Sequence, residues 1–152
     1  MKRHSLVLVL AVFVCSSLLY AGGLYETTEN GKQTLTVYAY DSFVSEWGPG
    51  PLIIPKFEEK TGISVNLISA GNGGELLNRL EFERHNPKAD VIIGISHELL
   101  HETLASQLLE PYQASALSHI PAWLHFDSTY HLLPFNYGNY AFVYDSHAIQ
   151  NP

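Results

Sequence analysis

Residues 97–101 read His-Glu-Leu-Leu-His, the H-E-x-x-H pattern of zinc metallopeptidases. On a helix, the imidazoles of His97 and His101 lie on one face, where they can share a metal ion. Glu98 between them can then act as the general base on a metal-bound water. The first hypothesis that the sequence offers is therefore a zinc hydrolase.

The rest of the chain does not complete a zinc site. A catalytic zinc needs a third protein ligand and an open coordination position. The longer H-E-x-x-H-x-x-G-x-x-H form fails because Leu104 and Gln107 stand where glycine and histidine are required. We interpret the pattern as a polar helix face, with adventitious metal binding by the histidine pair as an alternative and a zinc hydrolase as the least favoured reading. We therefore predict no enzyme, no metal site and no cofactor.

Three apolar segments predict the strands that must position any site. Residues 34–40 and 63–69 alternate in polarity as strands do, and residues 89–95 form the continuous apolar run of a strand buried on both faces of a parallel sheet. Helical patterns follow each strand, in residues 52–62, 75–85 and from His97 onward. This order predicts an α/β fold, a doubly wound and mostly parallel sheet with flanking helices.

The first of these helices contains a proline. Pro55 lacks the amide that an interior helical position uses. We therefore expect the helix either to bend there or to start later than Pro51.

Residues 1–21 have the layout of a secretory signal peptide. A basic start precedes the apolar run Leu6 to Val14, and small residues lead to Ala21, where we predict cleavage. A lipid anchor at Cys15 is the less favoured alternative, because the preceding residues lack the small side chain that such a site carries. Residues 22–33 read as a flexible leader.

Charge restricts the partners of the exported chain. The 8 basic residues fall to 6 when Lys2 and Arg3 leave with the signal, against 15 acidic residues, for a net charge of −9. Nucleic acid is thereby excluded as a partner, whereas a small cation is favoured. Solubility alone also accounts for most of these charges.

Four separated blocks carry a resemblance to a known family. They read TLTVYAYDSFVSEWGPGP, LLNRL, KADVIIGI and PFNYGNYAFVYD, in residues 34–51, 76–80, 88–95 and 134–145. In this order they resemble the periplasmic thiamine-binding proteins of bacterial ABC importers, which belong to the type II periplasmic-binding-protein superfamily. The resemblance runs from about Leu35 to Pro152. Iron- and polyamine-binding relatives share the fold and looser versions of some blocks, so ferric iron and polyamines are the alternative ligands.

The resemblance implies a two-lobe clamshell that closes on its ligand by a hinge motion and delivers it to a membrane permease. Residues 34–135 would form one lobe, and residues 136–152 a crossover strand region toward a second lobe, which is missing. We therefore expect a truncated or split product, located in the periplasm. The full-length form should be a monomer, and a fragment should associate through the exposed segment 140–145.

The expected site lies at the carboxyl ends of the strands, where ligands bind in open α/β sheets. Thiamine has a cationic thiazolium and a flat aminopyrimidine, which favour aromatic faces and nearby carboxylates. The loop Gly71–Gly74 would offer backbone N–H groups to a hydroxyl or phosphate tail. Asn72 and Asn136 stand where the family carries acidic residues. The loss of those negative charges would weaken or alter ligand recognition. The predicted ligand-binding residues are Tyr40, Asp41, Ser42, Trp47, Asn72, Gly73, Gly74 and Tyr137, and the predicted ligand is thiamine or its phosphate esters.

Overall fold

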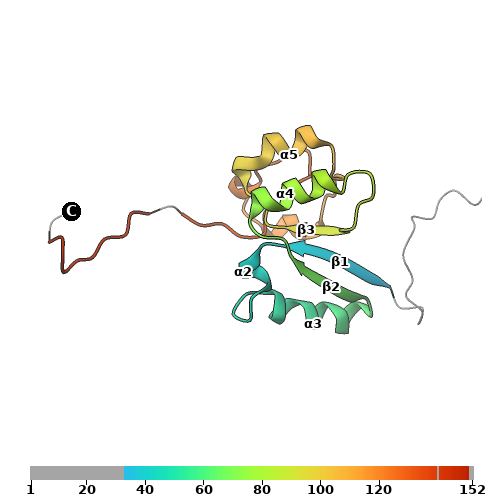
Figure 1. Cartoon of the computed structure of the whole chain (residues 1–152), viewed down its shortest axis with the longest axis horizontal. Helices are drawn as coiled ribbons and strands as arrows, with labels where there is room; N and C mark the ends of the chain where they lie inside the picture. The colour runs from blue at the N-terminus through green and yellow to red at the C-terminus, as the bar shows by residue number, and fades with distance from the viewer. Residues whose placement is uncertain (1–32, 140, 151–152) are drawn as a thin grey trace, which may run out of the picture.

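The computed structural model describes residues 33–139 and 141–150. A three-stranded parallel sheet with the order β2-β1-β3 forms its centre (Figure 1). Strand β1 (Thr34–Ala39) pairs along its whole length with β2 (Ser64–Ser69), and its last three residues pair with β3 (Val91–Ile93). The predicted signal peptide, Cys15 and most of the predicted leader lie outside the described residues.

Helices lie on both faces of this sheet. Helix α3 (Gly50–Thr61) covers one face, and α4 (Gly73–Phe82) and α5 (Leu100–Ser106) lie on the other (Figure 1). The predicted doubly wound α/β fold is therefore confirmed. The remaining short helices are α2 (Asp41–Val44), η1 (His97–Leu99), η2 (Ser115–His119) and η3 (Ala122–Leu124). No helix in the described part is long and apolar enough to cross a membrane.

Helix α3 starts earlier than Pro55 suggested. It begins at Gly50, so the expectation of a start after Pro51 is wrong. Pro51 occupies the first turn, where a missing N–H removes no helical bond. Pro55 leaves the carbonyl of Pro51 without its usual amide donor, but that loss falls near the helix start. The end agrees with the sequence, because Gly62 terminates the helix with a left-handed φ of 74°.

The order of the strands corrects one expectation about burial. The apolar run of residues 89–95 was predicted to be buried on both faces, yet β3 lies at an edge of the sheet and Val91 is 43 % exposed. The central position belongs to β1, whose Val37, Tyr38 and Ala39 are all buried. Polarity patterns record how apolar a strand is, but they do not record which strands stand beside it.

A polar network anchors α4 to the central strand. The buried Tyr38 hydroxyl donates to the Glu83 carboxylate at 3.0 Å and accepts from the Arg79 guanidinium at 3.0 Å. Arg79 also lies 4.0 Å from the Tyr38 ring centroid and 3.1 Å from Glu83. Burial, reinforced by the bond to Glu83 and opposed by the charge of Arg79, raises the pKa of Tyr38. This network and the buried Leu76 fix the helix that leads into the site.

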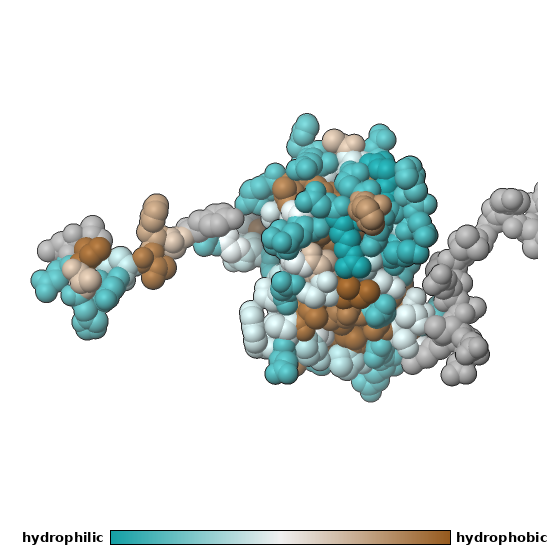
Figure 2. Space-filling model, in the orientation of Figure 1, coloured by the Kyte–Doolittle hydropathy of each residue, from teal (hydrophilic) through white to brown (hydrophobic). Residues whose placement is uncertain are grey.

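The end of the described chain leaves the body of the protein. Residues 141–150 extend away from it (Figure 1), and Figure 2 shows apolar side chains on this projecting tail. Phe142 and Val143 are almost fully exposed. In the described residues from 130 on, the structure contains no strand. The crossover strands and the association of the exposed segment stay predictions.

Candidate functional site

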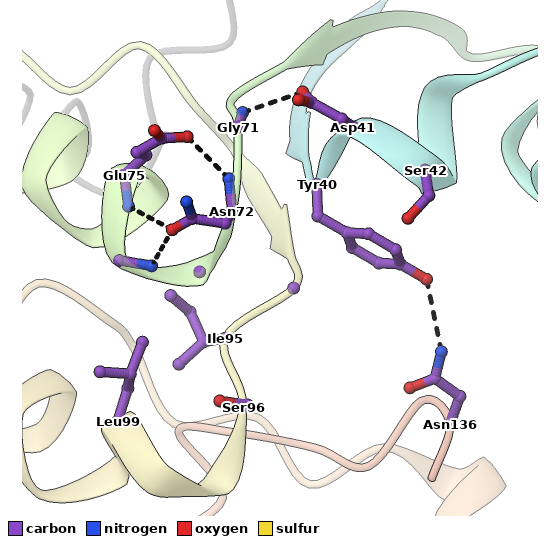
Figure 3. A pocket seen from close by; sticks show the side chains of 13 residues that line it. Tyr40, Asp41, Ser42, Gly71, Asn72, Glu75, Ile95, Ser96, Leu99 and Asn136 are labelled. Carbon is purple, nitrogen blue, oxygen red and sulfur yellow. Dashed lines mark hydrogen bonds between the residues drawn. The ribbon is translucent and has the colours of Figure 1, made fainter. Parts of the chain in front are cut away.

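A cavity of about 740 Å³ opens at the carboxyl ends of all three strands (Figure 3). This volume lies within the range of small-molecule sites. Six of the eight predicted residues line it: Tyr40, Asp41, Ser42, Asn72, Gly73 and Gly74. The other lining residues are Gly71, Glu75, Gly94, Ile95, Ser96, Leu99 and Asn136. The rule that ligands bind at the carboxyl ends of parallel strands therefore located the cavity, but it did not identify all of the residues that line it.

Tyr40 forms an aromatic wall that is held on several sides. Its amide donates to the carbonyl of Ile93 at 3.0 Å, and its hydroxyl accepts from the Asn136 side-chain amide at 3.3 Å (Figure 3). The ring packs against the backbone of Gly94, where an added Cβ would come within 2.7 Å of it. The Phe43 ring meets it edge-on at 5.9 Å. A planar ligand would therefore meet a preorganised ring.

Asp41 joins two of the loops that form the cavity. Its backbone amide donates to the carbonyl of Gly71 at 3.0 Å, and its Oδ1 accepts from the Gly71 amide at 3.1 Å and from the hydroxyl of Ser69. The loop after β1 is thereby fixed to the loop after β2 (Figure 3). Asp41 thus has a structural task in addition to contributing negative charge to the cavity.

The loop before α4 caps its own helix. The Asn72 side chain accepts from the amides of Gly74 and Glu75 at 3.0 and 3.1 Å, and the Glu75 carboxylate accepts from the Asn72 amide at 2.9 Å. These contacts form a capping box. Together with the bond from Gly71 to Asp41, they engage three of the four amides in residues 71–74. The expectation that this loop offers free N–H donors is therefore wrong for all but Gly73.

Trp47 and Tyr137 do not line this cavity. Trp47 lies in the turn between α2 and α3 and is 79 % exposed. Tyr137 is 65 % exposed, packs edge-on against Trp123 with 5.4 Å between ring centroids, and lines a neighbouring hollow of about 1150 Å³ along β3. The two hollows share part of the Tyr40–Asn136 wall. A ligand-binding role for Trp47 or Tyr137 stays a prediction.

The third strand supplies the residues that sequence reasoning missed. Gly94, Ile95 and Ser96 follow β3 directly, in the same relation to their strand as Tyr40 has to β1. The strand-end rule that located the first two loops applies equally to this one. Asn136 was noted from the resemblance but not included in the predicted ligand-binding set, and it comes from a segment without periodic pattern, 96 residues away from Tyr40 in sequence.

The H-E-x-x-H pattern is divided between two kinds of helix. His97–Leu99 form the 3₁₀ turn η1, and His101 lies in α5. Because a 3₁₀ turn holds about three residues rather than 3.6, the i,i+4 spacing does not align the two imidazoles as a continuous α-helix would. Both histidines are exposed. In the part of the chain that the structure describes, no group of three or more His, Cys, Asp or Glu side chains could hold a metal ion.

Asp127 orders the turn that leads to Asn136. Its buried carboxylate accepts from the hydroxyl and amide of Thr129 at 2.6 and 2.8 Å and from the amides of His131 and Leu132 at 2.8 and 2.9 Å. Burial pushes the pKa of Asp127 upward, but these hydrogen bonds outweigh it and hold the pKa below its usual value.

This depressed pKa gives a pH-dependent contribution to stability. We expect Asp127→Asn to lower the free energy of unfolding by about 1–3 kcal/mol near neutral pH, because an amide replaces a charged acceptor. The folded-state pKa lies below the unfolded value of about 3.9, so the contribution is complete above that value and disappears as pH falls through the folded-state pKa. Urea unfolding from pH 7 to pH 2 measures it. A difference between wild type and variant that stays constant over this range contradicts the assignment.

Comparisons with known proteins agree with this architecture. Residues 36–151 match the family model of the bacterial extracellular solute-binding protein. The thiamine-binding periplasmic protein of Brucella suis is 39 % identical over 122 residues, covering 80 % of this chain and 36 % of that protein. The chain thus spans about a third of the length of the curated relative.

Solved structures extend the similarity. A periplasmic thiamin binding protein superposes with a TM-score of 0.61 at 31 % identity, covering 86 % of this chain and 40 % of that one. A ferric binding protein from Campylobacter jejuni superposes with a TM-score of 0.50 at 36 % identity, covering 63 % of this chain and 29 % of that one.

Proposed function

Because the chain belongs to the bacterial extracellular solute-binding proteins, we propose that the cavity at the strand ends binds thiamine for delivery to an ABC importer permease from the periplasm. The membership itself confirms the expectation of a binding protein rather than an enzyme. The periplasmic location and the ligand are supported by the relatives, which are named as periplasmic thiamine-binding proteins.

One observation carries the choice of ligand. Tyr40 presents a fixed aromatic face, and the acidic residues Asp41 and Glu75 are among those that line the same cavity. A cationic ring is attracted both to the face of an aromatic side chain and to nearby negative charge. The thiazolium of thiamine is such a ring, and its flat aminopyrimidine suits the same wall. Ferric iron stays the alternative ligand, although the described residues contain no group of three His, Cys, Asp or Glu side chains that could hold a metal ion.

Isothermal titration of the chain with thiamine tests this function, with ferric citrate and spermidine as parallel titrants. We expect thiamine to be the only one of the three titrants that gives heat of binding. A Tyr40→Ala variant should bind thiamine about tenfold more weakly, because it loses ~1–2 kcal/mol of binding free energy. Tyr112→Ala is the matched control, since Tyr112 is an exposed tyrosine outside the cavity. If the chain binds iron or spermidine but not thiamine, the proposed ligand is wrong. If the two variants bind thiamine with equal affinity, Tyr40 is not part of the binding site.

A further inference from the structure

We propose that Asn136 is a positioning residue that fixes the ring of Tyr40 before a ligand arrives, and that residues 127–136 form the clasp that holds Asn136 in place. This inference rests on the proposed function, because it assigns to Asn136 a share of the affinity that Tyr40 provides. It follows from the contacts at the two ends of the clasp.

The hydroxyl of Tyr40 finds its partner in the clasp rather than in its own loop. The ring is held near its base, where it packs against the backbone of Gly94 and meets the Phe43 ring edge-on. At the far end of the ring, the Asn136 side-chain amide donates to the hydroxyl at 3.3 Å (Figure 3). In the described part of the chain, this amide is the one hydrogen-bond partner of the hydroxyl. The orientation of the far end of the ring therefore depends on Asn136.

Phe135 brings the clasp against the same loop through apolar contacts. Its ring meets the Phe43 ring with 5.6 Å between centroids, and the buried Phe43 in turn meets Tyr40 at 5.9 Å. Both contacts are edge-on, an arrangement that aromatic pairs prefer. Two consecutive residues of the clasp thus support the Tyr40 loop, one through a chain of rings and one through a hydrogen bond.

The other end of the clasp is anchored by the hydrogen bonds of Asp127. Its buried carboxylate accepts from the Thr129 hydroxyl and from the amides of His131 and Leu132. Because the single hydroxyl proton of Thr129 goes to Asp127, the His131 Nδ1, which lies 2.8 Å from Thr129 Oγ1, carries the proton that it donates there. Leu132 is buried as well. The clasp therefore leaves a fixed turn shortly before it reaches Asn136.

This support affects binding through the freedom of the ring. A side chain that is already held in its bound orientation loses less conformational freedom when a ligand stacks on it. Without the Asn136 amide, the base of the Tyr40 ring stays packed while its far end is released. One hydrogen bond between neutral groups contributes modestly, so we expect a loss of affinity of about threefold, smaller than the loss on removal of the whole ring.

A double-mutant cycle, measured by isothermal titration of the full chain with thiamine, tests the role of Asn136. Asn136→Ala should weaken binding about threefold in the wild-type background and should have no further effect in the Tyr40→Phe background, where the hydroxyl is already absent. Asn139→Ala is the matched control, because Asn139 is an exposed residue of the same segment that does not line the cavity, and it should keep the wild-type affinity. No loss in Asn136→Ala, an equal loss in both backgrounds, or the same loss in Asn139→Ala overturns the proposal.

A second readout needs no ligand and separates this inference from the proposed function. In the free ¹⁵N-labelled chain, Tyr40→Phe should shift the side-chain amide signals of Asn136 and leave those of Asn139 in place. Unchanged Asn136 signals overturn the proposal whether or not thiamine binds. If the Asn136 signals shift but the wild-type chain does not bind thiamine, the proposed function is wrong, while the support of Tyr40 by Asn136 stands.

Discussion

Gly94→Ala is expected to weaken thiamine binding by tenfold or more while lowering the free energy of unfolding by about 1–3 kcal/mol. Gly94 has a φ of +127°, a backbone conformation that residues with a Cβ rarely adopt. The added Cβ would also lie 2.7 Å from the Tyr40 ring. Real Cβ atoms essentially never approach a neighbour within 3.0 Å, so Tyr40 has to move. The same ring is the aromatic face on which the proposed function depends. Calorimetric titration and urea unfolding of the variant measure the two effects.

Two other glycines separate the causes of this loss. Gly62 also has a positive φ, of +74°, but nothing lies within 4 Å of an added Cβ, so Gly62→Ala should lose stability and keep its affinity. Gly138 has neither feature, so Gly138→Ala should change neither quantity. An affinity for thiamine in Gly94→Ala equal to that of Gly62→Ala shows that Gly94 does not position Tyr40.

Leu76→Ala should lower the free energy of unfolding by about 2–5 kcal/mol, which is a large part of the stability of a small domain. Leu76 is 0 % exposed and lies in the first turns of α4, in the cluster that joins this helix to β1 and to Ala70. Its removal leaves a cavity that the surrounding sheet and helix fill only in part. Urea unfolding followed by circular dichroism at 222 nm measures the loss.

Leu52→Ala is the matched control for this effect. Leu52 lies on helix α3 and is 69 % exposed, so the same change of side chain removes little buried area. We expect a loss of no more than about 0.5 kcal/mol. If the two variants lose equal stability, Leu76 is not part of the core that holds α4 in place.

The architecture was accessible from the sequence because its local signals agree with one another. The alternation in residues 34–40 and 63–69 and the helical pattern from Glu75 predicted elements that the structure contains. The place of β3 at the edge of the sheet was not accessible, since it depends on contacts between strands rather than on the polarity of Val91 or Ile92. The predicted start of α3 after Pro51 was wrong, because the effect of Pro55 on the helix depends on its distance from the helix start.

The sequence predicted the part of the cavity wall that directly follows a strand end. Tyr40, Asp41 and Ser42 follow β1 without an intervening turn, so the strand determines where they lie. Trp47 is separated from β1 by α2 and a turn, is largely exposed and does not line the cavity. Asn136 reaches the cavity only through tertiary packing.

The sequence contains the spacing of a capping box in the loop before α4, but we interpreted that loop as a ligand-binding segment. Asn72 precedes Glu75 by three residues at the start of a helical pattern, which is the spacing of a capping box. We expected the same loop to present its amides to a ligand. In the structure three of those four amides, of Gly71, Asn72 and Gly74, are bonded to Asp41, Glu75 and Asn72, because a helix start needs its donors satisfied whether or not a ligand is present.

The most direct test of thiamine binding in the cavity is a map of amide chemical shifts in the ¹⁵N-labelled chain during titration with thiamine. We expect the largest changes to cluster in residues 40–42, 71–75 and 94–96 and in the side-chain amide of Asn136, which together surround the cavity. Changes confined to the neighbouring hollow, around Trp123 and Tyr137, or no change at saturating thiamine, would contradict it.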